Sequence, residues 1–468
     1  MISRNFTHNM YCTGRNIVDK NKDTELYFAL DSFSRLAKNL SNAAIYRLRQ
    51  NFTSRGKDVL SPNQKEILSE IDLVVTALDR PRPKAVISYP FLEKMMRLTE
   101  NPDFFSGLPM QTAQYILKDK VNDFKNWLSA LRSYHADPKG YTGKPKMPGY
   151  IRREQRFFTI TNQDCVINRS EGRTYLKFPK TKAKLKIQEL PHDAKLKEVK
   201  VIPYYGTFEI LYTYETKEEA PADDLSNSAG LDIGVDNIAA IAVSNGSSLL
   251  IKGGAFKSEN RRFNMQRAKY ISILTKGHET RHVPATRMLC SLSKNRALFL
   301  LDACHQVSCR IVSYCLENKI STLYIGRNRY WKQRSNLGKT NNQSFVQIPF
   351  DMLTKQIVYK AERKGIRVIM QEESYTSKAS FLDNDYMPVF GVDDGEAHFS
   401  GKRLKRGLYR SSDGTVVNAD INAAANILRK ASQDAFKEVP SADFLKNPQV
   451  IYFADLHKRN AVEGIAAE

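Results

Sequence analysis

The spacing of apolar residues divides the chain into a helical first part, a β-rich middle part and a mixed last part. Residues 24–52 carry apolar side chains at three- and four-residue intervals, which predicts an amphipathic helix. The same period predicts further helices at about 63–79, 90–99 and 109–134. Residues 1–135 are therefore expected to form a mostly helical segment.

The pattern changes after residue 135. Glycine, proline and basic residues interrupt the helical period over 136–155. Short alternating runs then predict β-strands, namely FFTIT, CVINR, TYLKF, KLKIQEL, VKVIPYY and TFEILYTY. We expect a small barrel or sandwich within residues 136–220. The acidic, proline-bearing stretch 216–229 is typical of a linker.

Strands and helices alternate in residues 221–468. Three β runs in AGLDIGVDNIAAIAVSNGSSLLIKG precede a long helical region at 256–318. A strand, a helix and a strand follow, and then an irregular basic segment at 374–415, a final helix (NADINAAANILRKA) and a loose tail after residue 435. The order β-β-β-α-β-α-β-α is that of the RNase H fold. The expected fold class is α/β plus mixed structure, with an RNase H-like C-terminal domain.

Charge points to a polyanionic partner. The 468 residues include 72 Lys plus Arg against 50 Asp plus Glu, a formal net charge of +22. Nucleic acid is the usual partner for such an excess, because phosphate contacts release condensed counterions. No stretch approaches ~20 consecutive apolar residues, and the N-terminus lacks the apolar core of a signal peptide. We therefore expect a cytoplasmic, nucleoid-associated protein with no membrane partner, and no feature specifies its oligomeric state.

Two aspartates stand where a metal-dependent nuclease of this topology needs carboxylates. Asp232 lies in an apolar strand, where a charge is costly unless a cation or a hydrogen-bond donor pairs with it. Asp420 begins the final helix, where capping that helix is its alternative role. Two-metal phosphodiester hydrolysis needs carboxylates from different elements, because one carboxylate cannot hold two cations ~4 Å apart.

Motifs around these aspartates resemble the TnpB family, transposon-encoded RNA-guided endonucleases related to compact type V CRISPR effectors and to the Fanzors. GLDIGVDN resembles the first RuvC motif of that family and NADINAAANI the third. The resemblance extends over residues 25–430, through GKPKMPGY, LLDACHQVS, IGRNRYWKQ, EESYTSKASFLD and GKRLKRGLYRSSDG.

The resemblance implies an organisation and a function. Residues 1–135 would form a helical REC-like segment with room for an N-terminal WED strand, 136–220 a β-barrel WED-like segment, and 221–468 a RuvC-like nuclease. It also implies that a guide RNA and double-stranded target DNA are the partners. The expected activity is RNA-guided DNA cleavage linked to transposition, with two Mg²⁺ as cofactor.

The second RuvC motif departs from the family. Most members place a glutamate directly after the fourth strand, but the matching residue here is Gly326. One alternative is a nuclease-dead, RNA-guided DNA-binding protein. The other is a relocated glutamate, since Glu372 and Glu373 end the next strand, about 4.8 Å away. The Fanzors resemble this second arrangement, with a glutamate three residues before a Thr-Ser pair, as Glu373 stands before Thr376 and Ser377.

Alternate residues of a strand face opposite sides, so Glu372 and Glu373 are not both expected at the site. Asp232, Glu373 and Asp420 are the predicted catalytic and metal-binding residues, with Glu372 as the fallback. A third alternative is a transposase that acts directly on DNA through the same three carboxylates.

Basic and aromatic side chains supply candidate nucleic-acid contacts. They are Lys144, Lys146, Arg152, Arg153, Lys182, Lys184, Arg261, Arg262, Arg327, Arg329, Trp331 and Lys332. Many family members carry a four-cysteine zinc ribbon, whose positions fall here on Ser380, Asp383, Arg410 and Asp413. Because none of these replaces a thiolate ligand, no zinc is expected.

Overall fold

The structure is a computed structural model that describes most of the chain from Asn9 to Leu456. Within that span it leaves out residues 80, 84, 218–224, 278–282, 284–285, 328–347, 390–397, 406, 438 and 440–441. The chain divides into two compact units, residues 1–217 and 218–468, and each is described by itself.

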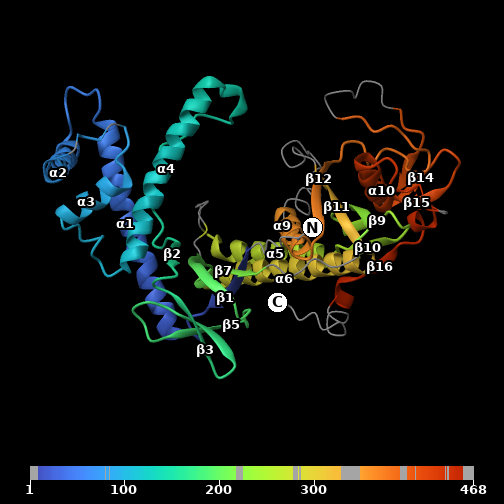
Figure 1. Cartoon of the computed structure of the whole chain (residues 1–468), viewed down its shortest axis with the longest axis horizontal. Helices are drawn as coiled ribbons and strands as arrows, with labels where there is room; N and C mark the ends of the chain where they lie inside the picture. The colour runs from blue at the N-terminus through green and yellow to red at the C-terminus, as the bar shows by residue number, and fades with distance from the viewer. Residues whose placement is uncertain are drawn as a thin grey trace, which may run out of the picture. The chain divides into compact units, whose positions relative to one another are not determined.

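Four helices of the first unit match the predicted periodicity closely. They are α1 (Thr24–Thr53), α2 (Pro62–Leu78), α3 (Tyr89–Leu98) and α4 (Met110–Ala136), followed by the short 3-10 turn η1 (Pro138–Gly140). Helix α2 begins with a capping box, in which the side chains of Ser61 and Gln64 each accept a hydrogen bond from the other's backbone N–H. Helix α1 buries one apolar stripe, including Leu26, Leu30, Ala37, Leu40, Ala44 and Leu48. Figure 1 shows α1 and α4 as the long helices of this unit.

The strands of the first unit form two antiparallel sheets. One has the order β1-β7-β6-β2, from β1 (Asn9–Val18), β2 (Phe158–Thr161), β6 (Lys195–Tyr204) and β7 (Thr207–Lys217). The other joins β3 (Val166–Ser170), β4 (Arg173–Lys177) and β5 (Lys184–Ile187). Strand β1 pairs with β7 over ten residues, and the ring of Tyr212 covers Gly14 where any side chain at position 14 would collide with it.

The second unit is built on a six-stranded sheet of order β12-β11-β8-β9-β10-β16. Strands β8 (Asn227–Asp232), β9 (Asn237–Val243) and β10 (Ser248–Lys252) are antiparallel neighbours. Strands β11 (Ile320–Arg327) and β12 (Arg367–Glu372) continue from β8 in parallel, and β16 (Gln449–Ile451) adds to β10. The predicted adjacency of the fourth and fifth strands is therefore confirmed.

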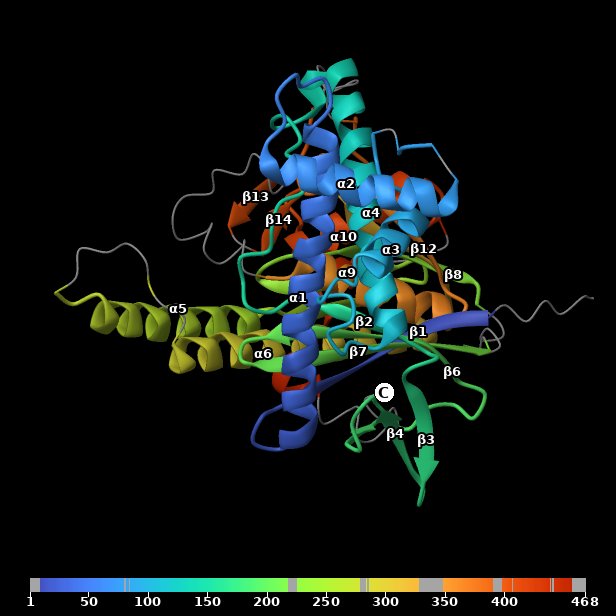
Figure 2. The same ribbon diagram turned by 90° about the vertical axis from the view of Figure 1, so that its left-hand side faces the viewer.

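Helices cover both faces of this sheet. Helices α6 (Arg287–Glu317) and α9 (Phe350–Arg363) pack their apolar side chains with Leu231 and Ile325 on one face. The predicted single helical region at 256–318 is in fact two helices, α5 (Gly254–Leu274) and α6, which lie side by side (Figure 2). Helix α10 (Ala419–Ala431) covers the opposite face, packed with Ala240 and Ala242.

Residues 374–415, predicted to be irregular, contain regular structure. Strands β13 (Lys402–Lys405) and β14 (Leu408–Arg410) fall in that segment and pair with β15 (Val416–Asn418) in a small antiparallel sheet. Their brevity explains why the alternation was too short to recognise in the sequence. The prediction of a loose tail after residue 435 is also wrong in part, because that segment contains the turn η3 (Ala442–Leu445) and strand β16.

Glycine at position 230 lets α10 approach the sheet. A Cβ atom at this position would collide with the carbonyl oxygen of Ala424 and lie 2.9 Å from the backbone nitrogen of Leu428. Helix α10 and the residues that it carries are therefore held directly over β8.

We predict that Gly230→Ala lowers the free energy of unfolding by about 3 kcal/mol, because the helix must move off the sheet. Urea denaturation of the full chain measures this loss. The control is Gly254→Ala, where a Cβ atom meets nothing within 4 Å. An equal effect of both substitutions would contradict the assigned close packing.

Candidate active site

Asp232 ends β8 at the carboxyl edge of the sheet. It lies two residues after Gly230, so its side chain is on the face covered by α10. The side chain is partly exposed. Asp232 is the first of the three predicted catalytic residues along the chain.

Glu373 follows β12 directly and lies over Gly326. A Cβ atom at position 326 would be 2.5 Å from Oε2 of Glu373 and 2.6 Å from Cδ1 of Ile427 in α10. The paired residues Ile325 and Leu231 place Gly326 and Asp232 next to each other on adjacent strands. Glu373 therefore lies over the strand beside Asp232, and its charge acts on the Asp232 carboxylate.

Asp420 lies in the first turn of α10 without capping it. The cap is Asn418, whose Oδ1 accepts hydrogen bonds from the backbone nitrogens of Asp420 (3.0 Å) and Ile421 (3.1 Å). The Asp420 carboxylate instead accepts a hydrogen bond from Nδ2 of Asn237 and lies 3.6 Å from Nη2 of Arg403. The alternative role of Asp420 as helix cap is therefore wrong.

Glu373 and Asp420 act electrostatically on Asp232. Removal from water, together with the charges of Glu373 and Asp420, raises the pKa of Asp232 to about 8, while Arg403 opposes this shift. Burial also raises the pKa of Glu373 to about 7, with a smaller contribution from Glu372. Without a bound cation, the protonated forms of Asp232 and Glu373 are therefore favoured.

Glu372 has different partners. Its carboxylate forms a 2.6 Å ion pair with Nζ of Lys430 and accepts a hydrogen bond from the backbone nitrogen of Ser374 at 2.7 Å. These contacts lower its pKa even though burial opposes them. The structure therefore brings Glu373, and not the fallback Glu372, toward Gly326.

The carboxylates do not form a closed ligand set as they stand. Within the described ranges, no three His, Cys, Asp or Glu side chains are grouped tightly enough to hold a metal ion. A cation nevertheless fits the chemistry here, because Oδ1 of the buried Asn237 has no hydrogen-bond partner in the described structure. Carboxylate and amide oxygens are the donors that Mg²⁺ prefers.

Most predicted nucleic-acid contacts are exposed. Residues 144–156 are fastened along α1, where Arg49 donates to the carbonyl of Pro148 and Asn42 bonds both backbone groups of Ile151. This extended segment exposes Lys144, Lys146, Arg152 and Arg153. Lys182, Lys184, Arg261, Arg262 and Arg327 are also exposed, although Arg262 pairs with Glu259 at 2.7 Å. Arg329, Trp331 and Lys332 lie outside the described residues.

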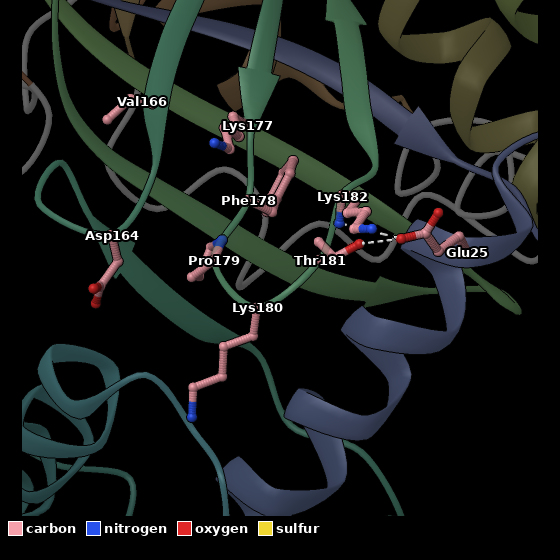
Figure 3. A pocket seen from close by; sticks show the side chains of 9 residues that line it. All are labelled: Glu25, Asp164, Val166, Lys177, Phe178, Pro179, Lys180, Thr181 and Lys182. Carbon is pink, nitrogen blue, oxygen red and sulfur yellow. Dashed lines mark hydrogen bonds between the residues drawn. The ribbon is translucent and has the colours of Figure 1, made fainter.

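A cavity of about 690 Å³ lies beside Lys177 and Lys182 in the first unit (Figure 3). Oε1 of Glu25 accepts hydrogen bonds from Oγ1 of Thr181 and from the backbone nitrogen of Lys182. Nζ of Lys180 donates to the carbonyl of Gly107 at 2.6 Å, so this ammonium is committed to a turn of the protein. Lys177 and Lys182 are the other lysines that line this cavity, and both are exposed.

Hydrogen bonds to carboxylates organise the segment in which the four zinc-ribbon positions were predicted to fall. Asp383 accepts a 2.9 Å hydrogen bond from the backbone nitrogen of Ser412, and Asp413 accepts one from Oγ of Ser411 at 2.6 Å. Oγ of Ser380 accepts from the backbone nitrogen of Asp383. These contacts hold the pKa of Asp383 well below its usual range, despite burial.

Sequence reasoning missed two residues beside the carboxylates, Asn237 and Arg403. Asn237 follows the turn after Asp232, and a buried asparagine at the start of an apolar strand was the available signal. Arg403 comes from β13, in the segment that was predicted to be irregular. No sequence signal placed it near Asp420.

Sequence comparisons connect the second unit to known proteins. The family model OrfB_IS605, described as "Probable transposase", matches residues 211–332, and "Cas12f1-like, TNB domain" matches residues 350–427. Cas12f2 of a Micrarchaeota archaeon is 28% identical over 230 residues, covering 47% of this chain and 39% of that protein. The TnpB-like protein ORF457 of Acidianus two-tailed virus is 27% identical over 217 residues, covering 45% and 43%. The chain thus spans about two fifths of these relatives.

A solved structure gives the same indication for the fold. The Cas12f1 chain in a complex with sgRNA and target DNA superposes with a TM-score of 0.50 at 14% identity, covering 86% of this chain and 82% of that one. None of the described helices combines the length and apolar character needed to cross a bilayer. The predicted TnpB resemblance is confirmed, and the chain is similar to TnpB-like and Cas12f-like proteins.

Proposed function

We propose that the protein is a transposon-associated, RNA-guided DNA endonuclease with a RuvC-like active site formed by Asp232, Glu373 and Asp420. The observation that carries this proposal is the Glu373 carboxylate over Gly326, close to Asp232. A side chain at position 326 would displace the Glu373 carboxylate. A glutamate relocated to position 373 therefore requires glycine at position 326.

Asp232, Glu373 and Asp420 would hold two Mg²⁺. When bound, these ions supply Lewis acids for the attacking water and for the leaving 3′ oxygen. Asn237 orients the Asp420 carboxylate by donating a hydrogen bond to it. Arg403 lies 3.6 Å from Asp420 and offsets negative charge at the site, and its half-exposed guanidinium would be available to a phosphate.

Guide RNA and double-stranded target DNA are the proposed partners. The net charge of +22 and the exposed cations of residues 144–153 support nucleic-acid binding. The Cas12f1 neighbour was solved with both sgRNA and target DNA. The helices of the first unit would act as the REC-like segment and its sheets as the WED-like segment, while base pairing with the guide supplies sequence specificity.

Two other functions have supporting observations. The open arrangement of the carboxylates and the glycine at position 326 favour a guided DNA-binding protein without nuclease activity. The description "Probable transposase" favours direct action on DNA ends. The first predicts guide-dependent binding without cutting, and the second predicts strand transfer without any RNA.

Cleavage should require RNA, divalent metal and Asp232 together. We expect the protein purified with its native transcript to cut matched DNA in Mg²⁺ and to lose at least about 10³-fold in rate as Asp232→Ala, because a metal ligand is gone. RNase treatment and EDTA should each abolish cutting. Strand transfer that survives RNase would support the transposase instead.

A relocated glutamate should be exchangeable with position 326. Gly326→Glu alone and Glu373→Ala alone should both lose most cleavage, the first through collision and the second through loss of a ligand. The double variant Gly326→Glu/Glu373→Ala should cut faster than either, as measured on matched DNA. Wild-type cutting by Glu373→Ala would refute the role of Glu373.

Stability without metal should fall as pH rises. Asp232 and Glu373 have folded pKa values of about 8 and about 7, above their unfolded values near 4, so the folded state binds more protons in that window. Thermal unfolding in EDTA should therefore show a lower Tm at pH 8 than at pH 5. The drop should shrink in Asp232→Asn, by about 1 kcal/mol or more, but persist in the exposed control Asp434→Asn. Mg²⁺ should restore wild-type stability at pH 8, and an absent Mg²⁺ effect would contradict a metal site.

A further inference from the structure

A second cavity adjoins Glu373 in the C-terminal unit. It has a volume of about 490 Å³, and Glu373 and Gly326 form one of its walls. The first turns of α9 and the carboxyl end of β11 form the others. The carboxyl ends of parallel strands are the edge at which open α/β sheets bind their ligands.

The walls combine apolar surface with cations. Val358, Met370 and Tyr359 line the cavity, and Met370 and Tyr359 are 39% and 50% exposed. Arg327 and Lys355 line it as well, and both are exposed. Such charges at the rim of a partly aromatic cavity attract an anion that also carries an apolar group.

Resting on the proposed nuclease function, we infer that this cavity binds one unpaired nucleotide of the DNA strand being cut, next to the scissile phosphate. Tyr359 stacks on its base. Arg327 and Lys355 contact the adjoining phosphates.

The size and position of the cavity select this ligand. A volume of about 490 Å³ suits one small-molecule-sized group, which a nucleotide is and a stacked duplex is not. A strand with its phosphate at Glu373 must continue past that residue, and this cavity is open beside it. Asp351 also lines the cavity, so the phosphates belong nearer Arg327 and Lys355.

Binding is measured in an Asp232→Asn background, which blocks cutting. The probe is a single-stranded DNA of about 12 nucleotides carrying one 5-iododeoxyuridine, which forms photo-cross-links with stacked aromatic side chains. We expect cross-links on Tyr359, and about tenfold weaker binding for Tyr359→Ala with near-normal binding for Tyr359→Phe. Arg327→Ala and Lys355→Ala should each reduce the salt slope of binding by about one. The control is Arg367→Ala, which removes an exposed cation at the amino end of β12, outside the cavity. This substitution should leave the salt slope of binding unchanged.

Cleavage by the otherwise wild-type, RNA-loaded protein separates this inference from the proposed function. If matched DNA is cut but Tyr359→Ala binds and cuts normally, or cross-links map away from α9, the nucleotide site is refuted and the nuclease stands. If nothing is cut yet binding depends on Tyr359, the nuclease is refuted and the cavity is a single-strand site of a guided DNA-binding protein.

Discussion

The arrangement of the C-terminal unit depends on one steric constraint, that the Glu373 carboxylate and a side chain at position 326 cannot share the same space. A glycine near the end of the fourth strand leaves room, and the glutamate that follows the neighbouring strand reaches into it. Parallel strands make this exchange workable, because their carboxyl ends meet at one edge about 4.8 Å apart. A glutamate at this edge can therefore come from either of two neighbouring strands without a change in the sheet.

Gathering carboxylates at that edge has an electrostatic cost. The raised pKa of Asp232 and of Glu373 shows that, without a cation, protons take up part of the charge. Asn237 and Arg403 stabilise the Asp420 end by a hydrogen bond and by charge. The remaining imbalance, and the unpartnered oxygen of Asn237, are what divalent ions would satisfy.

Periodicity predicted the helices well because each buries a continuous stripe, as α1 does with Leu26, Leu30 and Leu40. Asp232 was recognised in the sequence because a charge inside an apolar strand is costly unless a cation or a hydrogen-bond donor pairs with it. The prediction of Glu373 depended on the fourth and fifth strands being neighbours, which the pairing of β11 with β12 confirms. Arg403 could not be predicted, because β13 is four residues long and meets Asp420 through tertiary folding alone. The break between α5 and α6 was missed, although Gly277 and Pro284 stand in the sequence between these two helices.

The two close approaches in this unit have the same physical origin. Gly230 admits the backbone of α10, and Gly326 admits the Glu373 side chain. Both glycines open the same face of the sheet, so the helix that carries Asp420 and the glutamate that follows β12 converge on Asp232.

The most direct measurement is an anomalous-scattering map of crystals soaked in Mn²⁺. The account predicts manganese bound jointly by Asp232, Glu373 and Asp420, whereas a Glu373 turned away from a site with no metal, or with metal on the aspartates alone, would contradict it.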